Sequence, residues 1–88
     1  MTTNLKSLIN QGAIVLDVRT ASEFNAGHSE TAINMPLDQL GSKLETLQKE
    51  ATIITVCLSG MRSQVATSIL KANGFSHIYD GGSWTNFK

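Results

Sequence analysis

The sequence has only one cysteine, no excess of charge and no long hydrophobic run. Because Cys57 stands alone, no disulfide can form within the chain. A single unpaired thiol is more typical of a reducing cytosol than of an oxidising compartment. Seven basic residues balance seven acidic ones, and like charges are scattered along the chain. This charge pattern argues against nucleic acid or an anionic membrane as a partner.

Other absences narrow the class further. The longest apolar runs, AIVL and IITVCL, are far too short to cross a bilayer. Residues 1–10 lack the long apolar stretch of a signal peptide. No group of His, Cys, Asp and Glu has the spacing of metal ligands, so we expect neither a metal ion nor another cofactor. Repeats and linkers are also missing, and the sequence predicts one cytoplasmic domain over residues 1–88 with no membrane partner.

Two segments have the pattern of buried strands. Residues 13–18 and 51–57 are almost continuously apolar and rich in β-branched side chains, as strands covered on both faces tend to be. Residues 31–35 and 76–80 are shorter candidates.

Helical patterns separate these strands. Residues 40–47 place three leucines on one helix face. A second helix is expected to begin near Arg62 and to end at Gly74, and a short opening helix to end at Gly12. Strands that alternate with helices at this length predict an α/β fold, a small central parallel sheet of four to five strands flanked by helices. We expect the residues after Asp80 to form an irregular tail with at most one helical turn.

Cys57 lies where a parallel sheet places its ligands, at the carboxyl end of a strand. The next residues form a tight loop before the helix begins, and Gly60 suits the positive φ that such a loop usually needs. The backbone N–H groups of the loop, together with those of Arg62 and Ser63, are expected to converge on one anion.

Several converging donors are needed for a reactive sulfur. An ordinary cysteine with a pKa near 8.5 is only about 3% thiolate at pH 7. A helix N-terminus contributes about 0.3 to 1 kcal/mol to an anion, whereas each unit by which the pKa is lowered requires about 1.4 kcal/mol. The alternative is that Cys57 is a buried filler, because cysteine is among the most buried residue types. Gly60 and Arg62 favour the functional interpretation, since a simple buried strand would gain nothing from either.

Five segments together resemble the rhodanese family of single-domain sulfurtransferases. They occur in the family's order and span nearly the whole chain: LDVRTASEFNAGH (16–28), AINMP (32–36), CLSGMRS (57–63), ANGF (72–75) and DGGSW (80–84). The resemblance implies a parallel sheet wrapped by helices. It also implies a ping-pong reaction in which a sulfane sulfur passes through a persulfide on the cysteine.

Carried over by position, the resemblance implies that Cys57 is the nucleophile and persulfide carrier. The loop that binds the sulfur and its substrates then consists of Leu58, Ser59, Gly60, Met61, Arg62 and Ser63. The implied donors are thiosulfate or a persulfide, and the implied acceptors are cyanide or a thiol, including a cysteine of a partner protein. With no second cysteine in the chain, the acceptor must be external.

The spacing of this loop separates two chemistries. Four residues lie between Cys57 and Arg62, whereas phosphatases with a cysteine nucleophile have five and so form a loop wide enough for phosphate. The shorter loop favours sulfur over a small phosphatase or arsenate reductase. A catalytically silent interaction or sensor module is the other alternative.

Four further residues invite a functional interpretation. Asp17 is a candidate for pocket lining, because it also lies at a strand's carboxyl end, where it can accept backbone N–H bonds or meet Arg62. We expect Arg19 and Glu23 to pair with each other across the turn. His28 is expected to be architectural, since a thiolate that is held by N–H groups needs no general base.

Overall fold

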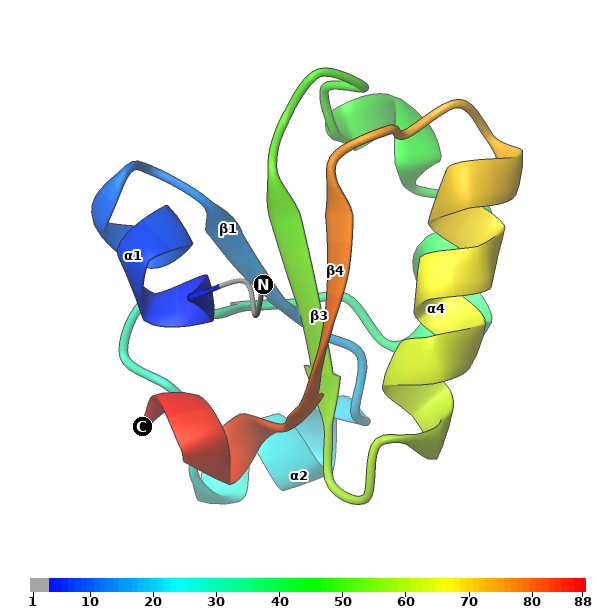
Figure 1. The fold of residues 1–88 in the computed structure, drawn as a ribbon. Coiled ribbons are helices and arrows are strands. Elements are labelled where there is room, and N and C mark those ends of the chain that lie inside the picture. The colour runs from blue at the N-terminus through cyan, green and yellow to red at the C-terminus, as the bar shows by residue number, and fades with distance from the viewer. Residues whose placement is uncertain (1–3) are drawn as a thin grey trace.

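The computed structural model describes residues 4–88. The predictions of one domain over residues 1–88 and of no signal peptide in residues 1–10 include residues 1–3, which lie outside the described residues. Within residues 4–88, four strands form one parallel sheet in the order β2-β1-β3-β4 (Figure 1). The strands are β1 (Ile14–Asp17), β2 (Ile33–Asn34), β3 (Ile53–Cys57) and β4 (Ile78–Ser83). The predicted α/β fold with a small parallel sheet is confirmed.

Helices cover both faces of this sheet. They are α1 (Leu5–Asn10), α2 (Ala21–Ala26), α3 (Leu37–Leu40), α4 (Met61–Ala72) and the 3-10 helices η1 (Leu44–Thr46) and η2 (Trp84–Phe87). One face packs Val15, Ile54 and Val56 against α1 and η2. The other face packs against α3, η1 and α4, so that α1 and α4 lie on opposite sides of the sheet in Figure 1. Within residues 4–88, every helix is too short or too polar to cross a bilayer.

The central strand β3 fixes the position of the site. All five of its residues are buried, and it lies between β1 and β4. The hydroxyl of Thr55 on this strand lies 3.1 Å from the carbonyl oxygen of Ser63 and 2.9 Å from the hydroxyl of Thr67, both on α4. These contacts, with the buried Ala66 and Leu70 of α4, hold the beginning of that helix against the end of β3.

The prediction of a single helix over residues 40–47 is wrong. α3 ends at Leu40, a turn follows, and η1 begins at Leu44. Gly41 is a poor helix former, and the hydroxyl of Ser42 donates to the carbonyl of Gln39, which competes with the helical backbone bonds. The leucines still face the core, because two short turns place them on one side as a single helix would.

The prediction of an irregular tail after Asp80 is also wrong, although η2 agrees with the expectation of at most one helical turn there. β4 continues to Ser83, and its pairing with β3 shifts so that Gly81 and Gly82 together lie opposite one residue. This is a β-bulge. A Cβ at Gly81 would lie 2.8 Å from Cγ2 of Ile54 and 3.0 Å from the carbonyl oxygen of Thr55, so this position requires glycine. The Gly-Gly pair that predicts an irregular tail instead permits a close approach within the sheet.

The sequence contains a signal for the start of α2 that hydrophobic periodicity does not reveal. The hydroxyl of Thr20 accepts the backbone N–H of Glu23, and the carboxylate of Glu23 accepts the N–H of Thr20. Thr followed three residues later by Glu is the capping-box pattern that marks a helix start. The expected ends of the other helices agree with the structure, since Gly12 and Gly74 have φ values of 102° and 91°.

Candidate active site around Cys57

Cys57 is the last residue of β3 and is fully buried. Its Sγ accepts the backbone N–H of Gly60, with N and Sγ 2.9 Å apart. Gly60 has φ 99° and ψ −14°, a left-handed conformation that an L side chain rarely adopts, and α4 begins at the next residue. The short loop therefore curls back over the sulfur at the N-terminus of the longest helix in the described chain.

The surroundings of the sulfur stabilise its anion. Burial opposes charge on the thiol, but the backbone N–H groups of Ser63, Gly60 and Arg62 together hold the pKa of Cys57 below its usual value. The N-terminal end of the α4 dipole acts in the same direction. Three of the residues expected at the site are thus brought to the sulfur by their backbone.

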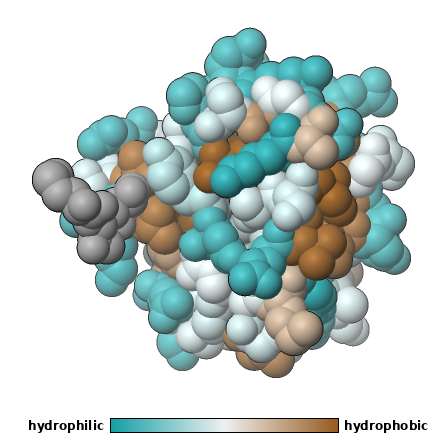
Figure 2. Space-filling view, turned by 45° about the vertical axis from the view of Figure 1, so that its right-hand side comes forward, coloured by the Kyte–Doolittle hydropathy of each residue, from teal (hydrophilic) through white to brown (hydrophobic). Residues whose placement is uncertain are grey.

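The other loop residues face outward. Leu58 is 56% exposed and Met61 is 74% exposed, and Ser59 between them is exposed as well. On the side seen in Figure 2, hydrophobic residues form separate patches between polar ones rather than one continuous face. Leu58 and Met61 thus expose apolar side chains in the loop that follows the buried Cys57.

The side chain of Ser63 links the loop to β4. Its hydroxyl is 2.6 Å from Oδ1 of Asp80 and 2.9 Å from the carbonyl oxygen of Gly60. A carboxylate is the stronger acceptor, so we assign the hydroxyl proton to Asp80. The same Oδ1 accepts the N–H of Gly82 in the bulge. Asp80 on β4 therefore holds the loop in place through Ser63, a role that was not predicted from the sequence.

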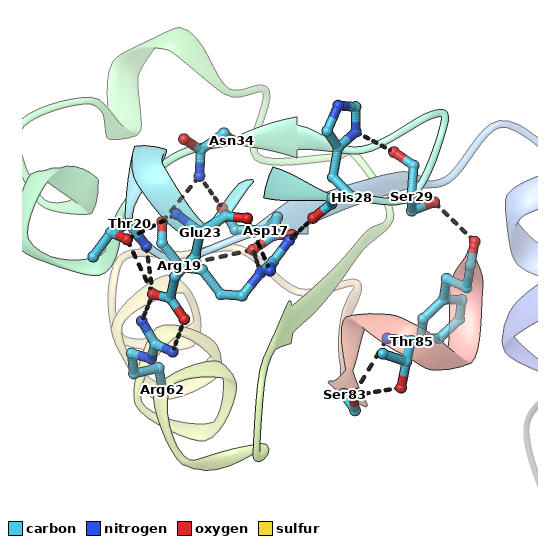
Figure 3. A network of polar contacts seen from close by, with 12 residues as sticks. Asp17, Arg19, Thr20, Glu23, His28, Ser29, Asn34, Arg62, Ser83 and Thr85 are labelled. Carbon is cyan, nitrogen blue, oxygen red and sulfur yellow. Dashed lines mark hydrogen bonds and ion pairs between the residues drawn. The ribbon is translucent and has the colours of Figure 1, made fainter. Parts of the chain in front are cut away.

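Arg62 pairs with Glu23 on α2 (Figure 3). Its Nη1 and Nη2 donate to the two carboxylate oxygens of Glu23 at 2.7 and 3.0 Å. The Arg62 guanidinium, with the N–H of Thr20, lowers the pKa of Glu23 to about 2, and the carboxylate in turn raises the pKa of Arg62. Arg19 and Glu23 are in contact across the turn as expected, but only through the backbone, since Nη1 of Arg19 donates to the carbonyl oxygen of Glu23 at 3.3 Å. The Glu23 carboxylate binds Arg62 instead.

Arg19 is bound by Asp17 instead. Its Nε and Nη2 donate to the fully buried Asp17 carboxylate at 2.8 to 3.1 Å, and Nη2 also donates to the carbonyl of Gly27. The guanidinium lies 4.5 Å from the centroid of the Trp84 ring. Asp17 is fully buried, and its Oδ1 also accepts the backbone N–H of Arg19, which is one of the contacts expected for it. It is a buried counterion that fixes Arg19, because a buried charge is stable only when paired.

A shallow groove of about 300 Å³ begins beside Leu58. It runs between α2 and η2, and we call it the Leu58–Trp84 groove. Its lining residues are Arg19, Glu23, Ala26, Gly27, Leu58 and Trp84. A second hollow of about 280 Å³ lies beside Arg62 and includes Pro36 and Leu37. Glu23 lines the first of these hollows, and its partner Arg62 lines the second.

His28 has structural contacts, in keeping with its expected architectural role. Its ring stacks on Phe24 with 3.9 Å between the ring centroids, and Nδ1 lies 2.8 Å from the carbonyl oxygen of Ser29. Within residues 4–88 no group of three or more His, Cys, Asp or Glu residues is placed to hold a metal ion. The site chemistry in this part of the chain is that of the cysteine, its N–H donors and its ion pairs.

Comparisons with known proteins agree with this geometry. The family model of the rhodanese-like domain matches residues 1–87. The thiosulfate sulfurtransferase GlpE of Pseudomonas savastanoi pv. phaseolicola is 30% identical over 79 residues, which are 88% of this chain and 74% of that protein. A tRNA uridine(34) hydroxylase of Buchnera aphidicola is 35% identical over 78 residues, and the match covers 82% of this chain but only 25% of that longer protein.

Solved structures show the same fold. The human single-domain sulfurtransferase TSTD1 superposes with a TM-score of 0.84 at 26% identity, over 92% of this chain and 86% of that one. The match to the family model extends over nearly the whole sequence, and the sheet order and the loop after β3 are features of the structure that do not depend on that match. The chain belongs to the family of rhodanese-like domains.

Proposed function

We propose that this protein is a sulfurtransferase that carries a sulfane sulfur on Cys57. The observation that carries the proposal is the N–H of Gly60 at 2.9 Å from Sγ at the mouth of α4, where the pKa of the thiol is lowered. A lowered pKa increases the thiolate, which is the nucleophilic form. The similarity to thiosulfate sulfurtransferases supports the same chemistry.

The reaction has two steps. In the first, the Cys57 thiolate attacks the outer sulfur of thiosulfate, the S–S bond breaks, and sulfite leaves while a persulfide remains on Cys57. In the second, an acceptor attacks the terminal sulfur and restores the thiolate, so that cyanide gives thiocyanate and a thiol gives its persulfide. The backbone donors of Gly60, Arg62 and Ser63 stabilise the anionic sulfur before and after transfer.

The acceptor is external, because Cys57 is the only cysteine of the chain. A thiol, cyanide or a cysteine of a partner protein meets this need. A cysteine that must return to the free thiol in each cycle also favours a reducing compartment such as the cytoplasm.

Mass spectrometry of the intact protein tests the proposal. After incubation with excess thiosulfate or an organic thiosulfonate, we expect a gain of one sulfur atom that reductant removes. The Cys57→Ser variant should gain none, and Ser68→Ala, which changes an exposed residue of α4, should behave as the wild type. If the wild type gains no sulfur from any donor, or if Cys57→Ser still makes thiocyanate, the proposal is wrong.

Burial of the thiol favours one alternative, a module that does not turn over. The Cys57 residue has no exposed surface, so a donor reaches the sulfur only when the loop or Leu58 moves. A thiol pKa at the ordinary value for cysteine, near 8.5, would support this alternative.

A phosphatase is less well supported. Its arginine must bind phosphate, whereas the Arg62 guanidinium is held by Glu23. Turnover of p-nitrophenyl phosphate would argue for that activity.

A further inference from the structure

The two arginines of the chain lie near the site, and both are neutralised. Glu23 holds Arg62 with two hydrogen bonds, and Asp17 holds Arg19 with three. An inorganic dianion that approaches the Cys57 thiolate therefore meets two ion pairs, each with no net charge, and backbone dipoles.

One lysine lies near the groove but faces another hollow. The ammonium of Lys88 is 5.7 Å from the centroid of the Trp84 ring, and Lys88 lines a separate hollow between α1 and η2 together with Lys6. It is not among the residues that line the Leu58–Trp84 groove. The charges that face this groove are Arg19 and Glu23, each with its partner.

The groove itself offers carbon surface next to the residue that follows Cys57. Leu58 follows Cys57 directly, and the other walls are Ala26, Gly27 and the ring of Trp84. The Trp84 ring is held in place, because Arg19 lies over it and a Cβ at Gly27 would already be 3.4 Å from Cη2 of the ring. A volume of about 300 Å³ accommodates an aromatic ring or a short alkyl group.

We propose that the sulfur donor of this site is a small organic thiosulfonate or persulfide whose uncharged apolar group lies in the Leu58–Trp84 groove. We assign Glu23 as the residue that selects against inorganic dianions, because it neutralises Arg62. This inference rests on the proposed sulfur transfer and specifies its donor class. For a thiosulfonate, the thiolate takes the outer sulfur and a sulfinate leaves. For a persulfide, the Cys57 thiolate takes the terminal sulfur with its proton, the S–S bond of the donor breaks, and the parent thiolate leaves.

Three donors with the same transferable sulfur test the inference. They are the dianion thiosulfate, the small monoanion methanethiosulfonate and the aromatic monoanion benzenethiosulfonate. Each kcat/KM is divided by the rate at which the donor reacts with free 2-mercaptoethanol, which removes intrinsic reactivity. We expect benzenethiosulfonate to exceed thiosulfate by about tenfold or more in the wild type.

The Glu23→Gln variant tests the charge. Glutamine can keep the capping box with Thr20, but it carries no charge and so leaves the positive charge of Arg62 without its counterion. Because a dianion interacts with that charge twice as strongly as a monoanion, a gain of about tenfold for thiosulfate should accompany a gain of only about threefold for methanethiosulfonate. Added salt should reduce both gains.

Two variants test the groove. Leu58→Ser should lower the ratio of kcat/KM for benzenethiosulfonate to kcat/KM for methanethiosulfonate by about fivefold or more, whatever its effect on access to the sulfur. Gly27→Ala should act in the same direction, since its φ of 166° suits any residue and its Cβ narrows the groove against Trp84. Val65→Ser is the matched control, because Val65 is also a half-exposed apolar residue but lies on α4 outside the groove. Circular dichroism checks that each variant is folded.

The outcomes separate the two proposals. The inference is overturned if Cys57 gains sulfur but thiosulfate is the preferred donor, or if Glu23→Gln changes the three donors equally. It is also overturned if Leu58→Ser and Val65→Ser have the same effect on the ratio of kcat/KM for benzenethiosulfonate to kcat/KM for methanethiosulfonate. If Cys57 gains no sulfur from any donor, the proposed function itself fails, and the inference fails with it.

Discussion

Replacing Gly60 by alanine tests whether the loop holds the sulfur of Cys57, because a lost hydrogen bond to Sγ and added backbone strain have different measurable effects. Gly60 has φ 99°, and the nearest atom to an added Cβ is Cα of Gly82 at 3.8 Å. The site thus has space for a methyl group, and the cost is conformational. A non-glycine residue in the left-handed region costs about 1 to 2 kcal/mol. The loop either stores this strain or relieves it by rotating the Gly60 N–H away from the sulfur of Cys57.

Rotation has a measurable effect on the thiol. A hydrogen bond to a charged group contributes about 1.5 to 3 kcal/mol, and about 1.4 kcal/mol is a factor of ten in an equilibrium. Loss of the 2.9 Å contact therefore raises the pKa of Cys57 and lowers the thiolate fraction by about tenfold at a pH below that pKa. Strain that is stored instead lowers the melting temperature by about 4 to 8 °C per kcal/mol in a domain of this size.

Gly12→Ala is the matched control. Gly12 has φ 102°, and an added Cβ there meets no atom within 4 Å, so the strain is the same but lies after α1, on the chain before β1. The assays are the pH dependence of alkylation of the only cysteine by iodoacetamide and thermal unfolding followed by circular dichroism. We expect both variants to lose stability and only Gly60→Ala to show slower alkylation and slower persulfide formation. If both variants lose the same stability and keep the wild-type thiol pKa, the Gly60 N–H does not hold the sulfur.

Three further changes have definite expected outcomes. Gly81→Ala should destabilise the protein by about 1 to 3 kcal/mol in thermal unfolding, because the added Cβ would overlap buried atoms. Gly41→Ala is the control: Gly41 has a helical φ of −60°, so alanine should stabilise the protein by about 0.4 to 1 kcal/mol. Equal effects of the two substitutions would contradict the bulge geometry. Asp17→Ala should cost about 3 to 5 kcal/mol in urea unfolding, because it leaves a buried guanidinium unpaired, and a loss below 1 kcal/mol would refute that pairing. The pKa of Glu23 is lowered from 4.5 to about 2, so the stability that its ion pair with Arg62 contributes is complete above pH 4.5 and disappears as the pH falls toward 2. Melting temperatures measured between pH 6 and pH 2 should show this acid dependence in the wild type and less of it in Glu23→Gln.

The sheet and the position of Cys57 at the end of a strand could be predicted from the sequence because their signals are local. Strands covered on both faces must be apolar throughout, and residues 13–18 and 51–57 match β1 and β3 within a residue or two. Once β3 is placed, Cys57 lies at its carboxyl end and the loop follows. The positive φ of Gly60 follows in turn, since few residues other than glycine adopt that backbone conformation.

The boundaries of weaker elements could not be predicted in this way. Leucines spaced as on one helix are equally well buried by two short turns, and only the Ser42 side-chain bond and Gly41 favour the break. The Gly81–Gly82 pair has the composition of a turn, but it forms a bulge because Ile54 and Thr55 leave no space for a side chain. In both cases the packing of distant residues decides the local structure.

The partner of Arg62 shows the limit of sequence spacing most clearly. Arg19 and Glu23 are four residues apart and so predict a local pair, but Glu23 binds Arg62, 39 positions away, because α2 lies beside the beginning of α4. The backbone N–H of Arg62 therefore helps to lower the pKa of Cys57, while its side chain is bound by the Glu23 carboxylate outside the loop. A phosphatase needs that guanidinium on its substrate. The short spacing between Cys57 and Arg62 and the ion pair with Glu23 are independent observations, one local and one long-range, and both favour a single sulfur atom over phosphate as the occupant of the loop.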